Sequence, residues 1–461
     1  MVKQTTNGQK MSRMNLQLRK FVFPFFLSVF FISSSYIYST PIYSLKNSYS
    51  PAQKEISYGK NGMVTTQHFI ATEVGEKILN KGGNAFDASI AIGFTLAVVL
   101  PRAGNIGGGG FMVMFDDATQ NLINLLDIPE NYSVLWLQGG ASLQFSMVPM
   151  NLLPNGGTAD YIDTGSWSAK AVIECQKFGN VNVIGSSKDS VYSYIPKNVV
   201  TSEDALYLHI TSNNTIYGTQ YKDYPEIKNT NSFLVADMSS DILSKPVDIS
   251  QFGLIYAGAQ KNMGPAGVTL VIIRKDLLDS NFRDVPTMMR YKTHSSKDSM
   301  FNTPPVFSVC VVNETLKWIQ SLGGLKEMEI INERKAEKLY TEIERNSLFK
   351  SPINKEDRST MNVPFVFLDK KIDDKIFLDY CLNKGLTTLK GHRSVGGFRA
   401  SIYNAMPEGG VDALIEAMQH FEKNYYFYLI TYWNIYSGFI SVYSHKKSSR
   451  AIYIIAQIGR V

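Results

Sequence analysis

The feature that most constrains this chain is a lysine turn between two apolar runs. Phe252–Ile255 leads into Tyr256–Gly267, which reads YAGAQKNMGPAG, and Val268–Ile273 leads away from it. Lys261 stands among glycines and a proline, so the backbone can turn tightly and approach a flat molecule closely. A lysine in such a dry turn is a candidate for a lowered pKa and for carbonyl chemistry, with an ordinary surface lysine as the alternative.

A carboxylate upstream narrows the chemistry. The strand-like run Ser232–Ala236 ends in Asp237. Ligands of open α/β sheets bind at the carboxyl ends of strands, where this side chain is expected. Pyridoxal phosphate needs a carboxylate to keep its ring nitrogen protonated and a lysine to bind its aldehyde. The order Asp237, strand, turn, Lys261 therefore favours a fold-type I pyridoxal enzyme.

The region downstream of residue 127 alternates strand-like and helix-like segments. Helices are expected at Leu325–Arg345, at Ile372–Asn383 and along Val411–Phe421, and a further strand at Val363–Leu368. The other apolar runs are Val134–Leu137, Tyr161–Ile162, Leu206–Ile210, Phe233–Ala236, Leu254–Ala257 and Val268–Ile273. Such alternation predicts an α/β fold with a largely parallel sheet.

Three stretches carry a specific resemblance to a known family. They are Val235–Gly267, SMFNTPP at Ser299–Pro305, and KGHRSVGGFRASIYNAMPEGGV at Lys390–Val411. With them, the chain from about Leu122 to Asn424 resembles the phosphoserine aminotransferases. The resemblance implies a large pyridoxal-phosphate-binding domain, 122–304, with a mainly parallel sheet, and a smaller α/β domain, 305–424. It also implies amino transfer between glutamate and 3-phosphohydroxypyruvate, giving phosphoserine and 2-oxoglutarate, and a related phosphooxy step of vitamin B6 synthesis.

The same resemblance assigns roles around the cofactor. Lys261 would bind the aldehyde and carry the proton between substrate and cofactor, and Asp237 would pair with the ring nitrogen. Trp167 would stack on the ring and Thr215 would contact it. The residues expected at the phosphate are Ala141, Ser142 and Gln260, with Asn302 and Thr303 of a neighbouring subunit. This last contact implies a homodimer.

Substrate contacts are implied by a second group of matched residues. Arg399 would grip the substrate α-carboxylate, and His392 and Arg393 would face the distal phosphate or γ-carboxylate. The family begins with Ser-x-Gly-Pro and Ser-His-Arg motifs that help bind this anion, and neither precedes the matched region here. We therefore expect impaired substrate binding and dimer packing.

The sequence before residue 117 has another character. Residues 58–116, with GGNAFDA and GGGGF, resemble the start of the mature γ-glutamyltransferase large subunit. Helices are expected at Phe69–Leu79, closed by Lys81–Asn84, and at Ala85–Val99. The glycines of Asn105–Asp116 could instead form a tight turn entering a strand. Since nothing matches the small subunit, which carries that family's nucleophilic threonine, no catalysis is expected from this piece.

Both ends of the chain differ from the middle. Residues 1–44 combine a basic start with the apolar run Phe21–Ile32, which is typical of a secretory signal. Residues 425–461 are Tyr-rich, and Tyr425–Tyr443 has no charged residue, so a membrane anchor and a foreign tail are alternatives. The signal-like segment favours export, whereas the aminotransferase family works in the cytoplasm.

Composition excludes some functions. A hydrophobic fraction of 44% and a charged fraction of 19% are typical of a globular protein. The net charge of +6 is spread along the chain, which predicts no nucleic-acid partner and suits anionic substrates. Cys175, Cys310 and Cys381 are far apart and predict buried packing rather than a disulfide or a metal site. Three functions stay open: an aminotransferase, an exported γ-glutamyl enzyme, and an inactive hybrid.

Overall fold

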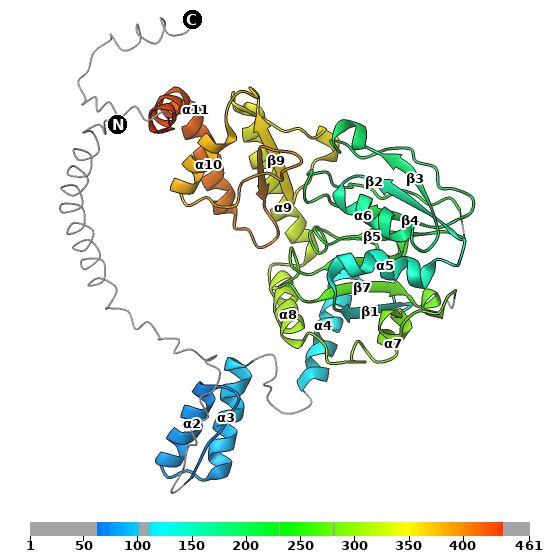
Figure 1. The fold of residues 1–461 in the computed structure, drawn as a ribbon, viewed down its shortest axis with the longest axis vertical. Helices are drawn as coiled ribbons and strands as arrows, with labels where there is room; N and C mark the ends of the chain where they lie inside the picture. The colour runs from blue at the N-terminus through cyan, green and yellow to red at the C-terminus, as the bar shows by residue number, and fades with distance from the viewer. Residues whose placement is uncertain (1–61, 101–109, 230, 280–281, 437–461) are drawn as a thin grey trace, which may run out of the picture. The chain divides into compact units, whose positions relative to one another are not determined.

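The chain forms two compact units, residues 1–104 and 105–461 (Figure 1). The computed structural model describes residues 62–100, 110–229, 231–279 and 282–436. The signal-like segment lies outside these ranges. So does the part of Tyr425–Tyr443 beyond Tyr436. Within the described ranges, no helix combines the length and hydropathy needed to cross a bilayer.

The first unit is a pair of helices, α2 (Phe69–Asn80) and α3 (Ala85–Val99), as the sequence predicted. Gly82, at φ 89°, ends α2 in the left-handed conformation, which the expected glycine cap requires. Asn84 and Asp87 then form a capping box at the start of α3. Four apolar residues of α3 are more than half exposed: Phe86, Ile90, Phe94 and Val98.

The second unit is built on a seven-stranded sheet with the order β1-β7-β6-β5-β4-β2-β3. The strands are β1 (Tyr132–Leu137), β2 (Thr158–Asp163), β3 (Asn180–Ser186), β4 (Ala205–Thr211), β5 (Phe233–Asp237), β6 (Phe252–Gly258) and β7 (Thr269–Arg274). Only β7 runs antiparallel to its neighbours. The sequence reading missed β3, because this edge strand is largely exposed and lacks a continuous apolar run.

Helices cover both faces of this sheet (Figure 1). Buried residues of α5 (Gly140–Leu152), α6 (Ser166–Cys175) and α7 (Tyr291–Ser295) pack on one face. Those of α4 (Gly110–Leu126) and α8 (Val306–Ser321) pack on the other. The strands serve both layers: Val235 faces the first core, whereas Leu234 and Ala236 face the second. This three-layer arrangement is the α/β fold predicted from the alternating pattern.

The start of the second unit corrects one expectation. The segment after the glycines is not a strand, because α4 runs from Gly110 to Leu126. Its buried residues Phe115, Ala118, Leu122 and Leu126 recur every three or four positions, which places them on one helical face.

A smaller lobe follows, with a three-stranded antiparallel sheet of order β10-β9-β8. Its elements are α9 (Leu325–Arg345), β8 (Phe349–Lys350), β9 (Asn362–Phe367), α10 (Asp374–Asn383), β10 (Phe398–Ser401) and α11 (Glu408–Tyr436). Phenylalanines fill its core, among them Phe365, Phe377 and Phe421. Helix α11 continues past Asn424, so the compositional change there is not a helix end.

The predicted domain boundaries stay predictions, although two details bear on them. The buried face of α8, assigned above to the smaller domain, contributes Val309, Val312 and Leu316 to the core of the large sheet. The cysteines are unpaired, and Cys310 is only partly buried, unlike the fully packed position expected for it.

Candidate active site

The parallel strands bring the predicted cofactor residues to one edge of the sheet. Asp237 ends β5, and the turn with Lys261 follows β6. Thr215 lies four residues beyond the end of β4. Leu137 and Gly258 pair with Thr269 from opposite sides, so the start of α5 and the Lys261 turn leave the sheet at the same level. Carboxyl ends of parallel strands converge in this way because successive strands point in one direction.

The Lys261 side chain is partly buried. Its Nζ donates a hydrogen bond of 2.6 Å to Thr215 Oγ1 and lies 5.8 Å from the centre of the Trp167 ring. Burial lowers the pKa of Lys261; the Asp237 carboxylate opposes this shift, and the Arg399 guanidinium adds to it. A larger fraction of neutral amine follows, and the neutral amine is the nucleophile toward an aldehyde.

The Asp237 carboxylate is buried and oriented. Its Oδ1 accepts hydrogen bonds from the Ser239 N–H, at 2.9 Å, and from the Ser239 hydroxyl, at 2.6 Å. No described residue donates a hydrogen bond to Oδ2, which is left for an external donor. Burial raises the pKa of Asp237, whereas the Ser239 hydrogen bonds and the nearby Lys261 lower it.

Trp167 belongs to the first turn of α6, which a serine holds in place. Ser168 Oγ donates to Asp163 Oδ1 at 2.9 Å and accepts the N–H groups of Thr164 and Gly165. A side chain at Gly165 would come within 2.5 Å of Asn214 Oδ1, so glycine is required there. The sequence reading missed one neighbour of Trp167: the amine of Lys170 lies 4.2 Å from the ring centre.

Arg399 reaches the same cluster from the smaller lobe. Its Nη1 donates to the Thr215 carbonyl oxygen at 3.2 Å, and its buried Nε has no hydrogen-bond partner. Thr215 thus accepts hydrogen bonds from both Lys261 and Arg399, and it lies 184 residues before Arg399 in the sequence. A guanidinium with an unused buried donor beside a reactive amine suits a small carboxylate.

The predicted distal-anion residues lie on the loop before β10. His392 Nδ1 contacts Ser394 Oγ at 2.8 Å and accepts the Ser394 N–H at 3.3 Å. Ser394 Oγ donates to Tyr217 OH at 3.4 Å, and Tyr217 OH contacts Ser166 Oγ at 3.1 Å. Arg393 is exposed. The sequence reading missed Tyr217 because its partner lies 177 residues away.

The predicted phosphate contacts surround the beginning of α5. Gly139 and Gly140, at φ 94° and 68°, turn the chain from β1 into the helix, which places Ala141 and Ser142 in its first turn. Free N–H groups at a helix start attract phosphate. Gln260 is exposed and its amide lies against Gly258 at the end of β6.

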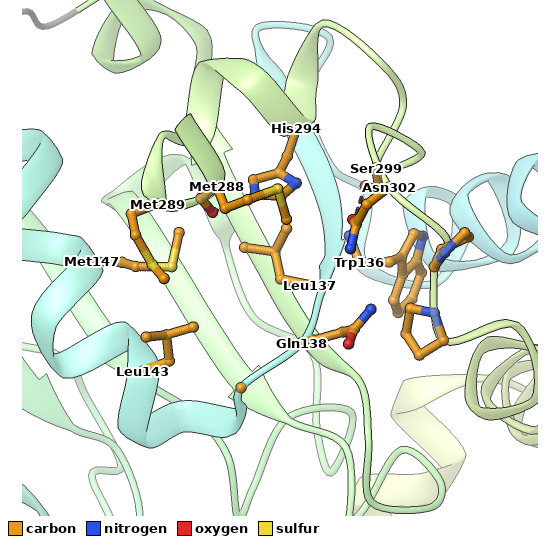
Figure 2. A pocket seen from close by; sticks show the side chains of 13 residues that line it. Trp136, Leu137, Gln138, Leu143, Met147, Met288, Met289, His294, Ser299 and Asn302 are labelled. Atoms are coloured by element: carbon orange, nitrogen blue, oxygen red, sulfur yellow. Dashed lines mark hydrogen bonds between the residues drawn. The ribbon is translucent and has the colours of Figure 1, made fainter. Parts of the chain in front are cut away.

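Asn302 and Thr303 lie elsewhere in the same unit. Asn302 lines a hollow of about 250 Å³ together with Gln138, Leu143 and Met288 (Figure 2). Gln138 Nε2 donates to the Thr303 carbonyl oxygen at 3.2 Å. Both residues are exposed, and no hydrogen bond joins either side chain to the Lys261 cluster within the described ranges.

These residues fit pyridoxal phosphate. The amine of Lys261 would take the aldehyde, Oδ2 of Asp237 would accept the proton of the ring nitrogen, and the start of α5 would hold the phosphate. The buried, unpartnered Nε1 of Trp167 and Nε of Arg399 mark donors that the chain itself leaves unused.

Comparison with known proteins agrees with this fit. The class-V aminotransferase family model matches residues 107–414. Phosphoserine aminotransferase of Parabacteroides distasonis is 50% identical over 68% of this chain and 88% of its own length. That of Hahella chejuensis is 51% identical over 68% and 86%. This chain belongs to the phosphoserine aminotransferase family.

Solved structures of the family are similar over the same region. Phosphoserine aminotransferase from Bacillus circulans subsp. alkalophilus superimposes with a TM-score of 0.66 at 44% identity, covering 68% of this chain and 87% of that one. The pyridoxal-phosphate-bound enzyme from Trichomonas vaginalis gives 0.63 at 40% identity, covering 67% and 88%. The predicted fold-type I architecture is therefore confirmed.

A second family overlaps the first at the start of the chain. The γ-glutamyltranspeptidase family model matches residues 71–132, which include most of α2 and all of α3 and α4. The two matches share residues 107–132.

Proposed function

We propose that this chain is a pyridoxal-phosphate-dependent aminotransferase that moves an amino group between glutamate and 3-phosphohydroxypyruvate. The observation that carries the proposal is the convergence of Lys261, Asp237, Thr215 and Arg399 at one sheet edge. A simple surface lysine, the alternative above, would not have its amine bonded to a buried threonine beside a buried carboxylate. The phosphooxy step of vitamin B6 synthesis is a second substrate of the same chemistry.

Each residue of the cofactor end has a defined task. When bound, pyridoxal phosphate supplies a ring that accepts the electron pair released at the substrate α-carbon. Lys261 Nζ takes the proton from that carbon and returns it on the cofactor side, with Thr215 orienting the amine. Asp237 Oδ2 holds the proton on the ring nitrogen. Trp167 covers the ring and excludes water from it.

The substrate end uses two guanidinium groups and one imidazole. Arg399 binds the α-carboxylate with the guanidinium edge that the chain leaves unpaired. The His392 imidazole and the Arg393 guanidinium bind the distal phosphate of one substrate and the γ-carboxylate of the other. Two chemically different anions fit one basic site because both present oxygen acceptors with negative charge.

We propose a homodimer, which the exposed positions of Asn302 and Thr303 support. Asn302 lines the hollow in Figure 2, and Thr303 follows it in the chain. Both are exposed, and within the described ranges neither side chain makes a hydrogen bond to the Lys261 cluster of its own chain. We assign them to the cofactor phosphate of a second copy. As compartment we propose the cytoplasm, in keeping with the aminotransferase fold, with export through residues 1–44 as the alternative.

Residues 58–116 are proposed to be a γ-glutamyltransferase-like fragment joined to the aminotransferase. The family match at 71–132 and the two predicted helices support this origin. The fragment should have no activity of its own. The full chain should therefore neither cleave itself nor hydrolyse a chromogenic γ-glutamyl amide above the rate of a Lys261→Ala control, and hydrolysis with self-cleavage would contradict this assignment.

The central test has two readouts. The purified chain, given pyridoxal phosphate, glutamate and 3-phosphohydroxypyruvate, should form phosphoserine and 2-oxoglutarate in equal amounts. Borohydride reduction of the loaded chain, followed by peptide mapping, should label Lys261. A label on another lysine, or none in a folded sample, would refute the assignment of Lys261, and a labelled chain without turnover would favour the inactive hybrid.

A further inference from the structure

Ser239 makes contacts that no step proposed so far uses. It follows β5 by two residues and is 6% exposed. Its hydroxyl donates to Asp237 Oδ1 at 2.6 Å and accepts the Gly258 N–H at 3.0 Å. Its own N–H donates to the same Oδ1 at 2.9 Å. One residue therefore joins the carboxylate at the end of β5 to the end of β6.

This arrangement fixes the Asp237 carboxylate in two ways. Two donors on Oδ1 stop the carboxylate from rotating, so that Oδ2 keeps one direction. The chain from the Gly258 N–H through the hydroxyl to Oδ1 polarises each bond in it, because hydrogen bonds in series strengthen one another in a low-dielectric interior. Gly258 is also only three residues before Lys261, so the same contact links the carboxylate to the strand that carries the amine.

We propose, on the basis of the function proposed above, that Ser239 is a positioning residue that aims Asp237 Oδ2 at the cofactor ring nitrogen. Ser239 itself would touch neither cofactor nor substrate. Its effect passes through Asp237 alone, which makes a specific prediction: the residue matters only for a ligand whose ring nitrogen can carry a proton.

The experiment measures affinity for two cofactors. The full chain, freed of cofactor, is titrated with pyridoxal phosphate and with the analogue in which C–H replaces the ring nitrogen. Ser239→Ala should weaken binding of pyridoxal phosphate by about tenfold, since a hydrogen bond to a charged group is lost. It should change the affinity for the analogue by less than about twofold, because the analogue has no proton for Oδ2 to hold.

Two further variants secure the comparison. Ser244→Ala removes another buried hydroxyl of the same segment, one without a hydrogen-bond partner, and should leave both affinities unchanged. Ser239→Cys keeps the shape with a weak donor and should give an intermediate loss for pyridoxal phosphate only. If the Ser239→Ala variant does not fold, the Ser239→Cys variant is used for the test instead.

Equal losses for the two cofactors would overturn the inference and leave Ser239 a purely structural role. No loss for pyridoxal phosphate would overturn it as well. Borohydride labelling of the unsubstituted chain separates this outcome from failure of the proposed function. A chain labelled at Lys261 but insensitive to Ser239→Ala refutes the positioning role alone, whereas an unlabelled chain refutes both.

Discussion

The cofactor end and the distal-anion end of the site are built differently. At the cofactor end, Asp237 and Thr215 are buried; Asp237 is the last residue of β5, and Thr215 lies in a turn four residues beyond β4. At the distal end, His392 and Arg393 lie on a loop, and Arg393 is exposed. The loop is tied to the large domain through Ser394 and Tyr217, by a bond of 3.4 Å.

The difference between the two ends shows which parts of the fold hold the site's side chains in position. Strand ends are fixed by the ladder and the core beneath them, so side chains at the cofactor end need no partner subunit to take their positions. A loop has few such constraints and gains precision from what covers it. We therefore expect the cofactor half of the chemistry to be largely intact in this chain and the distal half to be weakened.

The largest effect should come from Lys261→Ala. Loss of the amine removes both the cofactor attachment and the proton carrier, so kcat should fall by at least ~10⁴-fold. Turnover of glutamate and 3-phosphohydroxypyruvate measures this, with Lys177→Ala as the control, since Lys177 is an exposed lysine two residues beyond the end of α6. If the Lys261→Ala variant kept activity within tenfold of the unsubstituted chain, Lys261 would not be the catalytic lysine, and the contrast between the two ends of the site would fail.

A smaller loss separates the two anion contacts. Arg399→Ala should reduce kcat/KM by about 10²- to 10³-fold, since a largely enclosed carboxylate would lose its charged partner. Arg393→Ala should cost about tenfold or less, because water already reaches this side chain. Steady-state kinetics with both substrates measure each value, and an equal loss in the two variants would remove the distinction between the buried and the exposed end.

Supplying the family's usual N-terminal segment tests the distal end directly. A chimera with its Ser-His-Arg motif should raise kcat/KM for 3-phosphohydroxypyruvate by roughly ten- to several-hundred-fold, as an added charged hydrogen bond contributes ~1.5–3 kcal/mol. The affinity for pyridoxal phosphate should change little. Equal activity with and without the segment would mean that the chain compensates for it from elsewhere.

The smallest expected effect is a shift in the pH dependence of lysine labelling. Because burial lowers the pKa of Lys261 below the usual 10.5, its neutral fraction at a given pH below that value exceeds that of an exposed lysine. In the cofactor-free chain, trinitrobenzenesulfonate should therefore modify Lys261 at a lower pH than the exposed lysines. Peptide mapping across a pH series shows which lysines are modified first. Modification of the exposed lysines at a lower pH than Lys261 would contradict a lowered pKa at the cofactor end.

The lysine and the carboxylate of the cofactor end could be predicted from the sequence because each is marked by the residues immediately around it. Asp237 comes at the end of an apolar strand and Lys261 just after one, and because these strands are parallel, both side chains lie at the same edge of the sheet. The sequence reading missed Tyr217, Ser394 and the shared role of the Thr215 backbone, since these contacts join segments more than 170 residues apart. The exposed strand β3 and the four-residue strand β10 were not predicted either, because neither contains an apolar run long enough to indicate a strand.

Helix α4 has a consequence for how such a chain can arise. Its packing rests on Phe115, Ala118, Leu122 and Leu126, all in its last three and a half turns, whereas two family matches overlap across it. A recombination event near the helix start keeps that stripe whatever sequence precedes it, provided that the reading frame is preserved. If the chain arose in this way, the beginning of α4 would be a crossover point at which the preceding sequence is exchanged while the aminotransferase scaffold downstream stays foldable.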